Sequence, residues 1–250
     1  MTINHELDKD DLRAFESDAK VGLLATVNPQ GLPHITFIAT IQAKTPRQLI
    51  WGQFTEGLSK QHLKTNPHAA FLIMSLNKEL WRGKAQWTHE RKEGEEYELF
   101  NNKPMFRYNA YFGIHTVHYM DLVEVTEKEK LDMARIVRGV LQTKLAKGAV
   151  KTKSKDFILK PWAEQLFNKP GSLKFLAYVG DDGFPTMIPV IQCEAADSRR
   201  LAFSPAAYKE ELLKIPAGKT VALFGLTLNM EDVLIRGTFG GYGRYRGVTL

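Results

Sequence analysis

The sequence LATVNPQGLP at residues 24–33 occurs again in altered form as LAYVGDDGFP at residues 176–185, and the two stretches align without a gap. In each copy, two apolar and β-branched runs flank a short polar turn that contains glycine. The runs lie at 21–27 and 35–41 in the first copy and at 173–179 and 186–192 in the second. Such a turn between two such runs is typical of a β-hairpin. The chain is therefore predicted to contain the same hairpin twice.

Three further correspondences follow in the same order, at a separation of about 150 residues. They pair residues 49–51 with 201–203, 69–72 with 221–224, and Trp81-Arg82-Gly83 with Ile235-Arg236-Gly237. We interpret the chain as two copies of one unit. The expected domains are 1–126, a connecting helix and basic linker at 127–159, and 160–250.

Within each copy the pattern predicts short strands interrupted by helices. Further strands are expected at 48–53, 69–75, 80–87 and 116–125 in the first copy, and at 200–204, 220–227 and 233–239 in the second. Helices are expected at 8–17, 58–64, 90–101, 127–147, 161–168 and 208–213. The longest, 127–147, is expected to end at Gly148 and to bury an apolar stripe formed by Leu131, Ala134, Val137 (or Arg138), Leu141 and Leu145.

Composition narrows the class of protein. The 250 residues are 44% hydrophobic and 25% charged, which is the balance of a globular protein. The single cysteine, Cys193, excludes an internal disulfide and makes a reducing cytoplasm the expected compartment. No apolar run approaches the roughly 20 residues that cross a bilayer, and the start of the chain lacks the layout of a secretory signal, so we expect neither membrane nor export.

The formal net charge of +6 is concentrated where the two copies join, in the lysines at 144, 147, 151, 153 and 155. A solvated basic linker accounts for this cluster, and no nucleic-acid partner is expected because no aromatic platform or known module accompanies it. The usual hydrolase, metalloprotease and nucleotide-binding motifs are also missing. His115 and His118 have a spacing that puts them on opposite faces of a strand, so no metal site is expected.

The segment WGQFTEGLSKQHLKTNPH at residues 51–68 is the most informative for chemistry. A strand ends near Gln53, and a loop with Thr55 then delivers Ser59 and Lys60 into the first turn of a helix. Hydroxyls, unpaired backbone N–H groups and a cation together form an arrangement that binds phosphate. The alternative is that Ser59 is only a helix cap and Lys60 only a surface charge.

Read together, the hairpin LATVNPQGLPH, the segment TEGLSKQHLKTNPHAAF and the strand WRGKAQW, followed by an acidic helix, resemble the FMN-binding split-barrel family of pyridoxamine 5′-phosphate oxidase-like proteins. The resemblance covers residues 8–126, and a second, degenerate unit covers about 160–240. It implies a mainly β fold with flanking helices, built as two tandem split β-barrels, antiparallel and Greek-key-like. In this family FMN lies where two barrels meet, so the chain is expected to be a homodimer or an intrachain pseudo-dimer.

The resemblance also implies roles for particular residues. Thr55, Ser59 and Lys60 would hold the FMN phosphate, with Gln61 beside them. The strand carrying His34, Thr36, Phe37 and Ile38 would run along the ribityl chain and ring, with Thr36 where relatives often place a basic phosphate ligand. Arg82 would lie near the cofactor, or else form an interface salt bridge.

The second copy departs further from the family. Ser59-Lys60 is replaced there by Lys209-Glu210, so this copy is not expected to form a phosphate site. It would instead line the pocket of the first, through Tyr208, Tyr242 and Arg244.

The function implied is an FMN-dependent oxidoreductase that acts on a small-molecule redox substrate. It is not expected to be the oxidase itself, because the R-x-R-x-x-x-W ending is absent and only Arg244-Tyr245-Arg246 echoes its start. Two alternatives stay open. The first is another cofactor, either a deazaflavin or a haem bound by one of His34, His62, His68, His89, His115 and His118. The second is a binding module without a cofactor.

Overall fold

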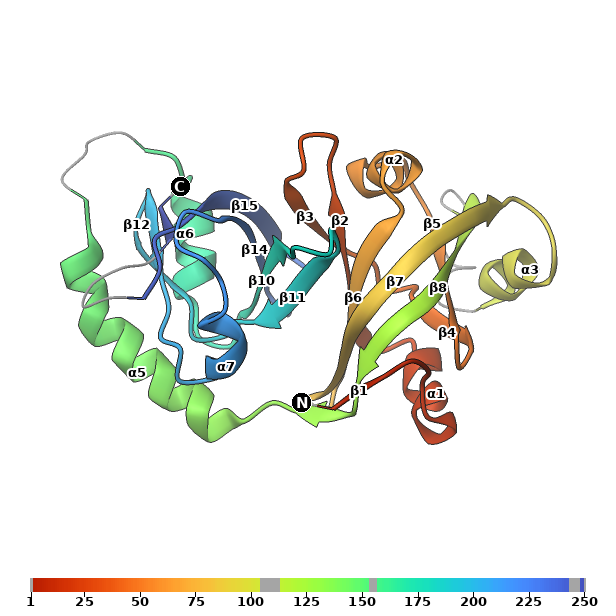
Figure 1. The fold of residues 1–250 in the computed structure, drawn as a ribbon, viewed down its shortest axis with the longest axis horizontal. Helices are drawn as coiled ribbons and strands as arrows, with labels where there is room; N and C mark the ends of the chain where they lie inside the picture. Colours follow the sequence, from red (N-terminus) through yellow and green to blue (C-terminus); the bar gives the residue numbers. More distant parts are fainter. Residues whose placement is uncertain (1, 104–112, 153–156, 243–247, 250) are drawn as a thin grey trace. The chain divides into compact units, whose positions relative to one another are not determined.

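A computed structural model describes residues 2–103, 113–152, 157–242 and 248–249. The chain forms two compact units (Figure 1). The first comprises Met1–Gly31, Thr36–Lys130 and Gly180–Thr186, and the second Leu32–Ile35, Leu131–Val179 and Met187–Leu250. Each unit is built on one antiparallel sheet with flanking helices. The predicted fold class, a mainly antiparallel β fold of the split-barrel kind with flanking helices, is confirmed.

The first sheet has the strand order β3-β2-β6-β7-β8-β5-β4, with β1 added to β8 and β9 added to β7. Its strands are β1 Ile3–Asn4, β2 Lys20–Val27, β3 Pro33–Phe37, β4 Gln42–Thr45, β5 Gln48–Gln53, β6 His68–Ser75, β7 Glu79–Arg91, β8 Thr116–Thr126 and β9 Glu129–Lys130. The helices are α1 Lys9–Glu16, α2 Leu58–Thr65 and α3 Glu95–Asn102. Figure 1 shows β7 and β8, the two longest strands, side by side.

The hairpin of β2 and β3 turns as its sequence predicts. Gly31 has φ +74°, a left-handed conformation that glycine adopts at little cost, and its amide donates to the carbonyl of Asn28. β2 is buried along nearly its whole length and pairs with β6. Its apolar side chains join a core that includes Phe15, Trp51 and Trp81.

The second sheet has the order β11-β10-β14-β15-β16-β13-β12, which repeats the order of the first. Its strands are β10 Leu173–Val179, β11 Pro185–Pro189, β12 Glu194–Asp197, β13 Arg200–Ala202, β14 Thr220–Leu226, β15 Asp232–Phe239 and β16 Val248–Thr249. Its helices are α5 Met133–Val150, α6 Pro161–Asn168 and α7 Lys209–Leu212. A separate core, with Phe167, Phe203 and Phe239, fills this unit.

Backbone features recur in the two units at a constant interval in the sequence. This interval equals the separation between Gln42 and Glu194. β4 and β12 start at these two residues, and each strand carries a bulge at the same place along its pairing. The amide of Ile38 donates to the carbonyl of Gly22, and that of Val190 donates to the carbonyl of Lys174. The two sheets are thus built on the same hydrogen-bond plan.

The register corrects one correspondence drawn from the sequence. Arg82 pairs with Leu72 across β6 and β7, whereas Arg236 pairs with Ala222, which is the counterpart of Ala70. Because Ala70 faces Lys84, Arg236 is the counterpart of Lys84 and not of Arg82. The sequence alignment was wrong by two residues there, because Arg-Gly occurs by coincidence in both strands.

The predicted helix 127–147 begins later, at Met133. Glu129 and Lys130 instead form β9 against β7, and the side chain of Asp132 caps the helix by accepting from the amide of Arg135. The helix also passes through Gly148 and ends at Val150. The prediction that Gly148 ends the helix was therefore wrong.

The predicted apolar stripe of this helix was also wrong. Val137, Leu141 and Leu145 are 54%, 59% and 87% exposed. The buried face of α5 is a different one and packs on β12 and β13; it consists of Ile136, Gly139, Thr143 and Val150. The small residues Ala196 and Ala202 on these strands contact Val150, and this tertiary fit selects the face that is buried.

The acidic helix predicted at 90–101 is shorter at its start. β7 continues to Arg91, which pairs with Val117 on β8, and α3 begins only at Glu95. The long pairing of β7 with β8 overrides the local charge pattern that favoured a helix from residue 90.

Candidate functional site

The loop between β5 and α2 presents the first turn of a helix together with its neighbouring polar groups. α2 starts after Gly57, and no side chain caps its first amides. Ser59, in the first turn, is buried, and its hydroxyl is hydrogen-bonded to the hydroxyl of Thr36 on β3. Uncapped amides and the helix dipole favour an anion at this position.

A cation stands at the same place. The ammonium of Lys60 donates to the carbonyl of Thr55, with 2.6 Å between Nζ and the oxygen. Partial burial lowers the pKa of Lys60, and the nearby carboxylate of Glu56 opposes that shift. An ammonium has three N–H donors, so its single bond to Thr55 anchors the chain while leaving capacity to donate to a ligand.

The predicted site residues fall into two groups. The structure brings together Thr36, Thr55, Ser59 and Lys60, with Gln61 exposed beside them on α2. Phe37 and Ile38 follow Thr36 along the chain; Phe37 is half-buried, and Ile38 packs into the core of the first unit.

His34 and Arg82 have other surroundings. His34 belongs by its contacts to the second unit, where its Nδ1 lies 3.3 Å from the guanidinium of Arg236. Arg82 is buried, and its Nη2 lies 2.8 Å and 3.1 Å from the two carboxylate oxygens of Glu129. This ion pair joins β7 to β9 within the first unit, so it is not the interface salt bridge considered from the sequence.

The equivalent region of the second unit is built differently. The hydroxyl of Ser204 donates to the side chain of Gln142, and its amide donates to Thr143, both on α5. Tyr208 precedes a helix of only four residues and has φ +56°. The hydroxyl of Tyr242 is buried and has no hydrogen-bond partner among the described residues, which do not include Arg244.

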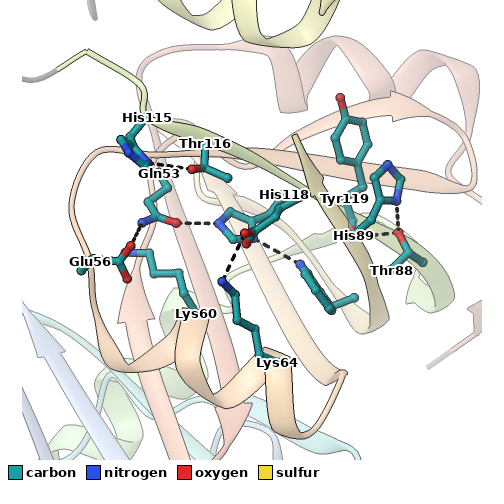
Figure 2. A network of polar contacts seen from close by, with 12 residues as sticks. Gln53, Glu56, Lys60, Lys64, Thr88, His89, His115, Thr116, His118 and Tyr119 are labelled. Atoms are coloured by element: carbon teal, nitrogen blue, oxygen red, sulfur yellow. Dashed lines mark hydrogen bonds and ion pairs between the residues drawn. The ribbon is translucent and has the colours of Figure 1, made fainter. Parts of the chain in front are cut away.

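A buried polar network beneath α2 was not anticipated as part of the site. His118 on β8 is 1% exposed, and its ring stacks on that of Trp51 with 3.9 Å between centroids. Its Nε2 lies 2.7 Å from Oε1 of Gln53, whose amide nitrogen in turn lies 3.0 Å from Oε1 of Glu56 (Figure 2). Burial lowers the pKa of His118 to about 3, and the positive charges of Lys60 and Lys64 act in the same direction.

The histidines considered as haem ligands are engaged in other contacts. Nδ1 of His62 is hydrogen-bonded to Thr26, and Nδ1 of His68 to the carbonyl of Gly183. Both ring nitrogens of His118 have partners, because the indole of Trp87 donates to its Nδ1. Among the described residues, no group of three His, Cys, Asp or Glu side chains could hold a metal ion. No helix in the described part of the chain is long and apolar enough to span a membrane.

The sheet order and the strand–loop–helix anion cradle define the class of protein as a split barrel with a candidate phosphate site in its first unit. Comparison with protein families agrees: residues 8–130 match the model of the pyridoxamine 5′-phosphate oxidase family. This part of the chain belongs to the pyridoxamine 5′-phosphate oxidase family.

Solved structures similar to the chain include a candidate pyridoxamine 5′-phosphate oxidase from Lactobacillus delbrueckii, with 16% identity and a TM-score of 0.40; the match covers 50% of this chain and 96% of that one. An FMN-binding protein from Syntrophomonas wolfei has 15% identity and a TM-score of 0.41, with 49% and 86% covered. General Stress Protein 26 from Bacillus anthracis has 13% identity and a TM-score of 0.37, with 49% and 98% covered. No curated protein matches the sequence.

Proposed function

We propose that the first unit binds FMN and that the protein is an FMN-dependent oxidoreductase acting on a small-molecule substrate. The observation that carries this proposal is the meeting of Thr36, Ser59 and Lys60 at the uncapped start of α2. Membership of residues 8–130 in the pyridoxamine 5′-phosphate oxidase family supports it.

The residues present fit a phosphate. Two hydroxyls, one ammonium and several backbone amides are all hydrogen-bond donors, and the ammonium adds the opposite charge. The carboxylate of Glu56, on the same loop, accepts from Gln53. A neutral ligand would gain less from this set, since the helix dipole and Lys60 both favour an anion.

Bound FMN would supply hydride or electron transfer through its ring, and the chain needs no acid or base of its own for that step. The phosphate would be anchored by Ser59, Thr36 and Lys60, which would thereby fix one end of the cofactor. We further propose that the substrate is not pyridoxamine 5′-phosphate, since R-x-R-x-x-x-W occurs nowhere in the sequence. We propose a cytoplasmic location, which the single cysteine, buried and reduced, supports.

The first experiment measures the visible spectrum of the purified protein and the affinity for added FMN. A flavin spectrum, with FMN as the released ligand, is expected. A colourless protein whose melting temperature does not rise with FMN would refute the proposal. Anaerobic addition of NADH or NADPH then tests the oxidoreductase role through loss of the visible absorbance of the flavin.

Two lysines on α2 provide a matched pair of variants for the site. Lys60→Gln removes the cation beside the helix start, and Lys64→Gln removes an exposed cation from the last turn, where it pairs with Glu90. FMN affinity is expected to fall at least tenfold in the first variant and less than threefold in the second. Lys60→Glu should abolish FMN retention while the fold is kept. Unchanged affinity in both Lys60 variants would place the phosphate elsewhere.

A further inference from the structure

We propose that His118 is a positioning residue for the FMN phosphate, acting through Gln53 and Glu56 on the loop that precedes α2. This inference rests on the proposed function. Its basis is a row of hydrogen bonds that runs from the core of the first unit to the candidate site (Figure 2).

The direction of the row follows from its first donor. The indole N–H of Trp87 can only donate, so Nδ1 of His118, 3.2 Å away, accepts. A neutral imidazole then carries its proton on Nε2, which donates to Oε1 of Gln53 at 2.7 Å. The amide nitrogen of Gln53 is left to donate to Glu56. Each group in the row donates toward the loop, and such aligned bonds strengthen one another.

The last hydrogen bond of the row reaches the loop between β5 and α2. Thr55 and Glu56 are exposed and lie between β5 and α2, outside any helix or strand. Gln53 fixes the side chain of Glu56, and Lys60 fixes the carbonyl of Thr55. These two bonds hold the loop in the conformation that starts α2 at Gly57, and they keep the carboxylate of Glu56 in contact with Gln53.

A histidine suits this position for two reasons. Its flat ring stacks on Trp51 in a space closed to water, while its two nitrogens accept at one edge and donate at the other. It also remains neutral, because burial and the positive charges of Lys60 and Lys64 lower its pKa. His118 therefore delivers an N–H to Gln53 without adding a charge close to the anion site.

The test compares FMN with riboflavin, which has the same ring and ribityl chain but no phosphate. Phe in place of His118 preserves a flat ring against Trp51 and removes both nitrogens. His118→Phe is expected to weaken FMN binding about five- to tenfold, the effect of one lost orienting hydrogen bond, and to change riboflavin binding less than twofold. If His118 only fills the core, its replacement should weaken the binding of FMN and of riboflavin equally.

Gln53→Met tests the same row by replacing this buried side chain with one of similar size and no charge. A methionine at 53 neither accepts from His118 nor donates to Glu56, so the same selective loss of FMN affinity is expected. The variant with both substitutions, at His118 and at Gln53, should lose no more FMN affinity than either single variant, because both substitutions break the same row of hydrogen bonds. Equal losses for FMN and riboflavin, or an unchanged ratio of the two affinities in Gln53→Met, would overturn the inference. A wild-type protein that binds neither flavin would instead refute the proposed function.

Discussion

The hydroxyl of Thr36 on β3 is hydrogen-bonded to the hydroxyl of Ser59 in the first turn of α2. The two residues are far apart in the sequence, and their contact joins the second strand of the hairpin to the helix that carries Lys60. A hydroxyl pair can donate and accept in either direction, so it can turn one proton toward an incoming phosphate oxygen without losing the contact.

We predict that Thr36→Val weakens FMN binding about tenfold, because the site loses one hydroxyl and Ser59 loses the partner that orients its own. Valine has the shape of threonine, which makes the missing hydroxyl the main change. The measurement is titration of the apo-protein with FMN by flavin fluorescence. Thr65→Val is the control on the same helix, since Thr65 lies at the end of α2 farthest from Ser59 and its hydroxyl donates to the carbonyl of His62. A loss as large in the control would argue against a role for Thr36.

FMN binding should depend on salt, whereas riboflavin binding should not. The site uses the charge of Lys60 and the dipole of α2, and ions screen exposed charges over about 10 Å at 0.1 M ionic strength. Titrations at several potassium chloride concentrations test this prediction. Parallel salt dependence for the two ligands would mean that the phosphate does not contact these groups.

The stability of the first unit should depend on the protonation of His118. Its pKa is about 3 in the folded chain and near 6.5 when unfolded, so between these values the unfolded state binds the extra proton. This contribution to stability is complete above about pH 6.5 and is lost as the pH falls toward 3, at up to about 1.4 kcal/mol per pH unit. Denaturant unfolding at pH 7 and pH 4 should show a shallower pH dependence for His118→Phe than for the wild type. An equal pH dependence of stability in the two proteins would contradict the prediction.

Gly83 should tolerate no side chain. A Cβ added there would lie 2.0 Å from the carbonyl oxygen of Glu124 on the neighbouring β8, and backbone cannot move aside cheaply. Gly83→Ala is expected to lower the free energy of unfolding by about 3 kcal/mol. Gly148→Ala is the control: it lies inside α5 with open space around it and should stabilise by about 0.5–1 kcal/mol. Thermal unfolding of both variants decides the matter.

The two faces of α5 should differ in energetic importance. Ile136 is buried, and Ile136→Ala should cost about 2–4 kcal/mol, whereas Leu145→Ala, on the exposed face, should change stability by less than about 0.5 kcal/mol. Denaturant titration compares them directly. Comparable losses of stability in the two variants would indicate that the stripe expected from the sequence is the packed face of α5.

The sequence predicts well what is encoded locally. The hairpin turn at Gly31, the start of α1 after Asp8 and the loop leading into Ser59 all depend on residues close together in the chain. The repeated motifs also predict the fold class, because they reveal both units at once.

What depends on distant packing could not be predicted. Which face of α5 is buried depends on Ala196 and Ala202, and the counterpart of Arg82 depends on the register of β7 against β6. The buried hydrogen-bond network around His118 was missed for the same reason. Its partners Gln53 and Trp87 come from two other strands, and a lone histidine on a strand gives no local sign of them.

The constant interval between the units shows where the chain has changed in length. The first bond that fits this interval joins Leu7 to Pro46, and its counterpart joins Leu159 to Ser198. The last joins Trp87 to Pro67, and its counterpart joins Phe239 to Lys219. Beyond this point the stretch of chain from Trp87 to Met120, which contains α3, is longer than the stretch from Phe239 to Val248 that occupies the equivalent place in the second unit. A difference in length between the two copies therefore falls in this connection. The two sheets keep the same strand order in spite of it, so the order does not depend on the length of this connection.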